Sequence, residues 1–189
     1  MKSRVLWVSA VALAVSISIP TAAPAQSGAE VFTATASMMA EGGAKTAQVK
    51  ITIDRFATEA ERAPVVNALR AGGNAAVKAA LDKMPGLGTF EVAGHKFPIR
   101  YAYPRATSAG RVVTVVMAEP IKHLGADLPA AKPKAGYDLA VALLVLDASD
   151  TGVGEFAPAA QIKVNEAGAV VLSDYGADKV WLKSVAKAK

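Results

Sequence analysis

The stretch with the most suggestive chemistry runs from Asp147 to Glu155. Its Asp, Ser and Thr residues alternate ahead of Gly152, and oxygen-bearing side chains around a sharp turn are what a calcium ion needs. The twelfth position of a calcium loop should hold a bidentate Glu, but here it is Pro158. A polar turn between two strands uses the same residue types. The sequence therefore favours a turn over a metal site.

The two histidines, His95 and His123, are the natural candidates for general acid–base chemistry. Each follows a glutamate by four residues, Glu91 in one case and Glu119 in the other. On a helix this spacing would place both groups on one face, but both pairs fall where the pattern predicts strands and turns. We expect His95 to begin an exposed strand and His123 to lie in a loop, neither with a catalytic role.

Tyrosines and arginines alternate between Arg100 and Arg105, an arrangement that can stack bases beside phosphates. In a strand, however, alternation places Tyr101 and Tyr103 on one face and Arg100 on the other. The tyrosines are then expected in the core, and no nucleic-acid partner is expected. The Gly72–Gly73 pair lacks the Lys-Ser/Thr of a phosphate loop, and no serine lies in a Gly-x-Ser-x-Gly elbow. We predict no catalytic, cofactor-binding or metal-binding residue and no cofactor.

The elements that position these residues are mostly strands. Residues 47–54 alternate between apolar and polar side chains, which is the two-residue period of a half-buried strand. Residues 111–117 and 137–146 are apolar on both faces, which predicts central strands covered on both sides. The segments expected to be strands are 31–38, 47–54, 89–92, 95–103, 111–117, 137–146, 159–164, 169–172 and 180–185.

One segment has a helical period. Thr58 and Glu61 fit a capping box, in which the Thr hydroxyl and the Glu carboxylate each satisfy a free backbone N–H. Gly72–Gly73 should interrupt the helix, and Asn74 could cap a second helical segment. That segment carries an apolar stripe formed by Val77, Ala80, Leu81 and Met84.

Short connections between the strands force antiparallel neighbours, because a parallel crossover needs a dozen residues or more. The predicted fold is therefore α+β: a curved antiparallel sheet of about eight strands, sandwich- or barrel-like, packed on one broken helix. A closed barrel that encloses the helix is an open alternative. Residues 124–136, with two prolines and two glycines, are expected to form a long loop.

The N-terminus has the three parts of a secretory signal. Lys2 and Arg4 form a positive head, 5–19 is apolar, and Ala23–Ala25 supplies the small residues read by a signal peptidase. The apolar run of about 15 residues is shorter than the roughly 20 that span a bilayer as a helix. We expect a signal peptide over 1–25 and a single sheet-rich domain over 26–189, exported to the periplasm or the medium. An uncleaved membrane anchor is the alternative.

Removal of the signal would lower the net charge from +5 to +3, since Lys2 and Arg4 leave with it. This mild excess differs from the dense basic stripe of a nucleic-acid binder. The chain has no cysteine, which excludes disulfides, thiolate catalysis and cysteine-ligated zinc. No run of 18 apolar residues follows the signal, so no membrane span is expected in the mature chain.

A set of short segments in the second half of the chain forms a recognisable pattern: Arg111–Val113, Glu119–Ile121, Tyr137–Leu139, Gly152–Glu155, Ala160–Lys163, Val171–Tyr175 and Val180–Leu182. Together they resemble a group of exported bacterial proteins of unknown activity. The resemblance covers about residues 58–185 and implies export and a shared fold. It implies no activity, so no functional residue is carried over from it.

Two classes of function follow from these observations. The first is a non-catalytic exported protein, either a carrier of an apolar ligand or an interaction module with a protein partner, because a sheet with apolar residues on both faces around a helix can leave a cavity. The second is a hydrolase or another enzyme whose site is assembled from residues distant in sequence. Convergence of His95 or His123 with a carboxylate and a serine would favour the second class.

Overall fold

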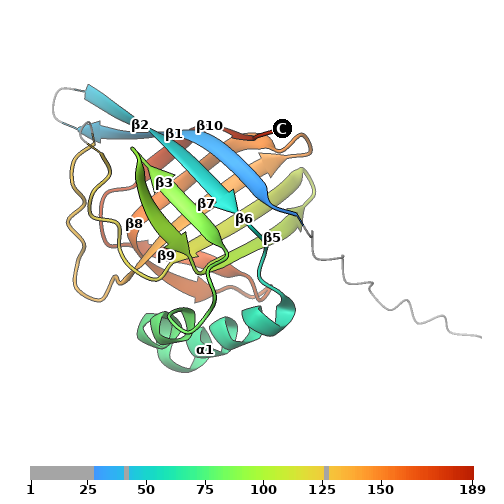
Figure 1. Ribbon diagram of the computed structural model, residues 1–189. Helices are drawn as coiled ribbons and strands as arrows, with labels where there is room; N and C mark the ends of the chain where they lie inside the picture. Colours follow the sequence, from blue (N-terminus) through green and yellow to red (C-terminus); the bar gives the residue numbers. More distant parts are fainter. Residues whose placement is uncertain (1–27, 41–42, 126–127) are drawn as a thin grey trace, which may run out of the picture.

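The computed structural model describes residues 28–40, 43–125 and 128–189. The predicted signal peptide lies outside these residues. Within them the chain forms ten strands and one helix, α1 (Glu59–Leu81) (Figure 1). The strands are β1 (Glu30–Ala40), β2 (Gly43–Ile53), β3 (Gly88–Val92), β4 (His95–Ile99), β5 (Tyr101–Thr107), β6 (Gly110–Met117), β7 (Leu139–Asp147), β8 (Thr151–Val164), β9 (Val170–Tyr175) and β10 (Val180–Lys187).

The strands form one sheet in the order β4-β3-β2-β1-β10-β8-β7-β6-β5, and β9 pairs with β8 beside this path. Every pair is antiparallel, including β2 and β3, which flank the helix in the sequence. The sheet curls until it is nearly closed, with β4 and β5 at its two edges. The predicted α+β fold with a curved antiparallel sheet is confirmed, and the sheet is barrel-like rather than a sandwich.

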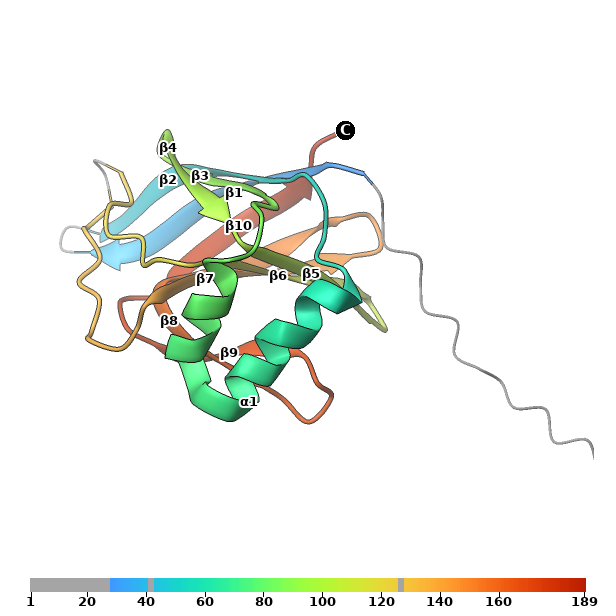
Figure 2. The ribbon, with the colours of Figure 1, turned by 60° about the horizontal axis from the view of Figure 1, so that its bottom comes forward.

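The helix lies outside the curled sheet, so the alternative of a barrel that encloses the helix is wrong (Figure 1). Thr58 and Glu61 form the predicted capping box, and Glu61 also holds Arg55 through two hydrogen bonds of 2.7 Å. Gly73 has a left-handed φ of 65°, and there the helix turns into a second segment at an angle to the first (Figure 2). The glycine pair therefore breaks the helix as predicted, because few other residues adopt this backbone conformation.

Asn74 does not cap the second helical segment as expected. Its Oδ1 accepts a hydrogen bond of 2.8 Å from the backbone N–H of Ile162 in β8. The side chain therefore ties the kink of the helix to the sheet. Beyond Asn74, Val77 and Leu81 are fully buried, whereas Ala80 and Met84 are only partly buried.

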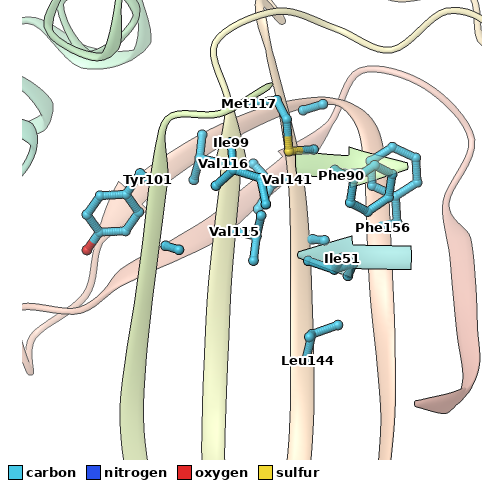
Figure 3. Packing of buried hydrophobic residues seen from close by; sticks show 14 of the residues in the cluster. Ile51, Phe90, Ile99, Tyr101, Val115, Val116, Met117, Val141, Leu144 and Phe156 are labelled. Carbon is cyan, nitrogen blue, oxygen red and sulfur yellow. The ribbon is translucent and has the colours of Figure 1, made fainter. Parts of the chain in front are cut away.

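The inside of the curled sheet is filled by large apolar side chains. The rings of Phe90 and Phe156 lie with their centroids 4.7 Å apart, near Ile51 (Figure 3). Ile51 pairs with Phe90 on one side and with Phe32 on the other, and all are fully buried. This interior comes from the alternate residues of each strand that face the same way. Leu144 of β7 belongs to the same interior face.

The outer face of β5 to β8 is covered by α1 and β9. Tyr101, Val116 and Val141 share this face through strand pairing, and each is almost completely buried. In Figure 3 Tyr101 lies well apart from the Phe90–Phe156 pair. Around Val116 and Val141, strands β6 and β7 are therefore buried on both faces, as their continuous apolar sequences predicted, whereas Val145 farther along β7 is exposed.

The predicted strand 95–103 is divided at Arg100, so a single strand was wrong. The backbone N–H of Arg100 donates to the Val116 carbonyl at 3.0 Å, and its guanidinium donates to the Met84 carbonyl at 3.0 Å. The chain leaves one edge of the sheet here and enters the other. Ile99 consequently faces the interior, whereas Tyr101 faces the helix.

The two edges carry proline at equivalent positions. A two-residue hairpin joins β3 and β4, and in it Phe90 pairs with Phe97. Backbone groups of successive residues point alternately toward and away from the partner strand, so the backbone nitrogen of Pro98 points toward the open edge. In the β5–β6 hairpin Thr107 pairs with Gly110, and Pro104 directs its backbone outward in the same way. Because proline has no N–H, neither edge offers a complete row of donors to another strand.

Strand β8 begins at Thr151, so the expected turn 147–155 is shorter than predicted. A Cβ on Gly152 would lie 2.0 Å from the Val145 carbonyl oxygen, and one on Gly154 would lie 2.5 Å from that of Leu143. The two glycines therefore allow β8 to lie close against β7. They read as turn residues in the sequence but serve close strand packing here.

Candidate functional site

The Asp147 side chain forms its hydrogen bonds within its own turn. Its carboxylate accepts hydrogen bonds from the backbone N–H and the hydroxyl of both Ser149 and Thr151, at 2.7–3.1 Å. These bonds, led by the one from the Ser149 hydroxyl, lower the pKa of Asp147 to about 2. Asp150 forms ion pairs with Arg111 and Lys187. The turn is thus held by its own side chains.

No group of three His, Cys, Asp or Glu side chains that could hold a metal ion occurs within the described residues. The hydrogen bonds of Asp147 to Ser149 and Thr151 close a local turn between β7 and β8.

The structure brings the two histidines together, which the sequence did not predict. The rings of His95 and His123 meet edge to face with centroids 4.6 Å apart. His95 begins β4 and His123 lies in the loop after β6, both exposed as expected. Glu91 lies 4.0 Å from Lys96 in an ion pair. In the part of the chain that the structure describes, neither imidazole hydrogen-bonds a carboxylate or a serine.

Of the two tyrosines in the Arg100–Arg105 segment, Tyr101 belongs to the core as predicted, whereas Tyr103 is only partly buried against it. Tyr101 is buried under α1, and this burial raises its pKa. Tyr103 stacks beside it and donates a hydrogen bond from its hydroxyl to Glu59, which raises the pKa of Tyr103. The Arg62 guanidinium lies 5.2 Å from the centre of the Tyr103 ring. This cluster joins the first turn of the helix to the sheet.

A group of four charges, two of them nearly buried, lies at one end of the sheet and was missed by sequence reasoning. Arg111 of β6 lies 2.9 Å from Glu30 and 2.8 Å from Asp150, while Lys187 lies 2.8 Å from Glu30. The side chain of Glu30 is only 5% exposed and that of Arg111 only 12%. The hydrogen bond to Glu30 raises the pKa of Lys187. The group joins β1, β6, β10 and the β7–β8 turn, and its charges balance.

The uncovered part of the outer face carries exposed apolar side chains. Val145 of β7 pairs with Val153 of β8, and they are 53% and 60% exposed. Trp181 of β10 pairs with Glu155 of β8 and is 52% exposed. We call Val145, Val153 and Trp181 the outer patch. Sequence reasoning missed the patch because it placed Val153 in a turn, and because strand alternation alone does not tell which outward positions lack cover.

Polar groups surround the outer patch. The Lys179 ammonium lies 3.9 Å from the centre of the Trp181 indole and pairs with Glu155, whose hydrogen bond raises the pKa of Lys179. Lys183 follows two residues after Trp181 in the same strand. Across the sheet, Arg105 pairs with Val112, which pairs in turn with Val145. An apolar centre with a charged rim is the arrangement found at protein interaction sites.

Comparisons with known proteins find no match. No family model, no curated protein and no solved structure matches the chain. The resemblance to a group of exported bacterial proteins therefore stays a prediction. Among the described residues, no helix has both the length and the hydropathy that a membrane span requires.

Proposed function

We propose that this protein is exported and acts without catalysis, as an interaction module that binds its partner through the outer patch. The observation that supports this most is the gathering of Val145, Val153 and Trp181 on one uncovered stretch of the sheet. Large apolar side chains that stand together on a surface, rather than singly, are the usual mark of a binding site. On β1 and β2 the outward side chains, such as Thr33 and Lys50, are exposed but polar.

The interior of the sheet supports an interaction module better than a carrier of an apolar ligand. Phe32, Phe90 and Phe156 are fully buried, and the last two are in ring contact where a ligand would have to lie. A hydrolase gains no support from the histidines, because His95 contacts His123 rather than a carboxylate and a serine.

Photo-crosslinking in intact producing cells tests the binding role. A diazirine-bearing residue placed at Val153 should form a defined adduct that is lost when Trp181→Ala is added. The same residue at Lys132, which is exposed in the long loop, serves as the matched control. Equal adducts at both positions, or adducts that persist without Trp181, would show that the patch is not a binding site.

Export is tested separately. The small residues Ala23–Ala25 predict that the mature protein begins at Gln26. N-terminal sequencing of the protein from the periplasm or the medium should read Gln26 or a residue next to it. A protein that keeps Met1 and stays in the membrane fraction would contradict the signal peptide while leaving the role of the outer patch open to the crosslinking test.

A further inference from the structure

We propose that His95 and His123 together bind a divalent transition-metal ion of the zinc and copper class. The two side chains come from separate segments, are exposed to solvent, and meet with ring centroids 4.6 Å apart. Exposed histidines are not needed for packing of the core. Imidazole nitrogen suits zinc, copper and nickel, and water completes the coordination where the protein supplies only two ligands.

The geometry fits two ligands on one ion. A metal–nitrogen bond is about 2.0–2.1 Å long, and the bound nitrogen lies about 1.2 Å from the centre of its imidazole ring. Two imidazoles bound to adjacent positions of one ion therefore have their ring centroids about 4.5–5.3 Å apart. The observed 4.6 Å lies in this range, and the planes are nearly perpendicular at 86°. Binding then requires that the two side chains rotate about their own bonds until a nitrogen of each ring points at the same ion.

The backbone that carries His95 is fixed by a tight turn. Ala93 and Gly94 both have left-handed φ values, 48° and 83°, as the two central residues of the β3–β4 hairpin. The Ala93 N–H also donates to the Gln48 carbonyl of β2 at 3.1 Å. His95 is the first residue after this turn, so its Cα has little freedom.

The backbone that carries His123 is fixed on both sides. Ile121 and Leu124 are buried, and the Ile121 N–H donates to the Pro158 carbonyl at 2.8 Å. The Lys122 carbonyl accepts from the Ala131 N–H at 2.8 Å. His123 is thus an exposed side chain on an anchored segment rather than on a free loop.

A glycine sets the distance between the two segments. Gly125 has a left-handed φ of 111°, and a Cβ added to it would lie 2.5 Å from the Cβ of Ala93. The loop after β6 can therefore approach the β3–β4 turn this closely only because residue 125 has no side chain. Preorganised ligands on two rigid segments are what a weak metal site needs to be selective for its geometry.

Zinc titration of the tag-free exported protein tests the site, with isothermal calorimetry and the melting temperature as readouts. Zinc should bind one to one and raise the melting temperature, because an ion held by both segments binds only the folded chain. His95→Ala and His123→Ala should each weaken zinc binding at least tenfold without changing the melting temperature of the metal-free protein. Lys122→Ala, a change beside His123 that keeps both imidazoles, is the control.

Copper(II) should bind more tightly than zinc, following the usual order for divalent ions. Gly125→Ala should weaken zinc binding although both histidines remain, because it pushes the two segments apart. Absence of saturable zinc binding in the wild-type protein would overturn the proposal. Binding that survives in either histidine variant would also overturn it, since the zinc would then be held elsewhere.

Discussion

The buried charges at the end of the sheet allow a quantitative prediction. Replacing Arg111 by Leu would leave the Glu30 carboxylate, 5% exposed, with Lys187 as its remaining cation at 2.8 Å. Removing one partner of a buried ion pair costs about 3–5 kcal/mol, because the other charge stays desolvated. Since Lys187 remains, we expect Arg111→Leu to lower the free energy of unfolding by about 3 kcal/mol, a large share of the typical 5–15 kcal/mol.

Urea unfolding followed by fluorescence measures this loss. The slope of the free energy of unfolding against urea concentration should stay unchanged if the transition is still two-state. Lys187→Leu is the matched control and should cost about 1 kcal/mol or less, because the Lys187 side chain is one-third exposed. Glu30→Leu combined with Arg111→Leu should recover much of the loss, because neither buried charge of that pair then remains without its partner. A double variant whose losses simply add, or an Arg111→Leu variant that loses less than about 1 kcal/mol, would refute this reasoning.

Three further outcomes are expected. Leu81→Ala should lower the free energy of unfolding by about 2–5 kcal/mol, since Leu81 is a fully buried residue of α1. Lys78→Ala, which removes only an exposed ion pair with Asp82, should change it by no more than about 0.5 kcal/mol. Similar small losses for both variants in urea unfolding would mean that the helix only rests on the surface. Hydrogen bonds from Arg55 lower the pKa of Glu61 from its ordinary 4.5 to about 2, so its contribution to stability is complete above pH 4.5 and is lost as the pH falls toward 2. Glu61→Gln should therefore reduce the fall in melting temperature as the pH is lowered through this range. A variant whose melting temperature falls with pH as steeply as that of the wild type would contradict a stabilising role for the Arg55–Glu61 pair. Millimolar calcium should leave the melting temperature unchanged, and a rise that Asp147→Ala abolishes would show a calcium site in the turn.

Features that depend on near neighbours in the chain were predictable. The capping box of Thr58 and Glu61 and the break at Gly73 are fixed within a few residues, and the structure has both. The alternation of β2 likewise follows from side chains that are next to each other in one strand. These elements determined the class of fold correctly.

Features that depend on strand pairing were not predictable. Gly152 and Gly154 look like turn residues until the carbonyls of β7 are placed beside them. The division at Arg100 occurs where the chain passes from one edge strand, β4, to the other, β5, and no local pattern encodes this change. The contact of His95 with His123 and the exposure of Trp181 depend on which segments meet and which positions stay uncovered, so the candidate sites emerged only from the structure.

The place of the last strand has a consequence for when this protein can fold. Strand β10 lies inside the sheet, paired with β1 on one side and β8 on the other. Before residues 180–187 have been synthesised, the ladders of β1–β4 and of β5–β9 have no strand in common. Without β10, the chain can therefore form two half-sheets but not the curled sheet, and the edges of β1 and β8 would be open to proteases and to aggregation. Strand β10 is thus the element on which the closure of the whole sheet depends.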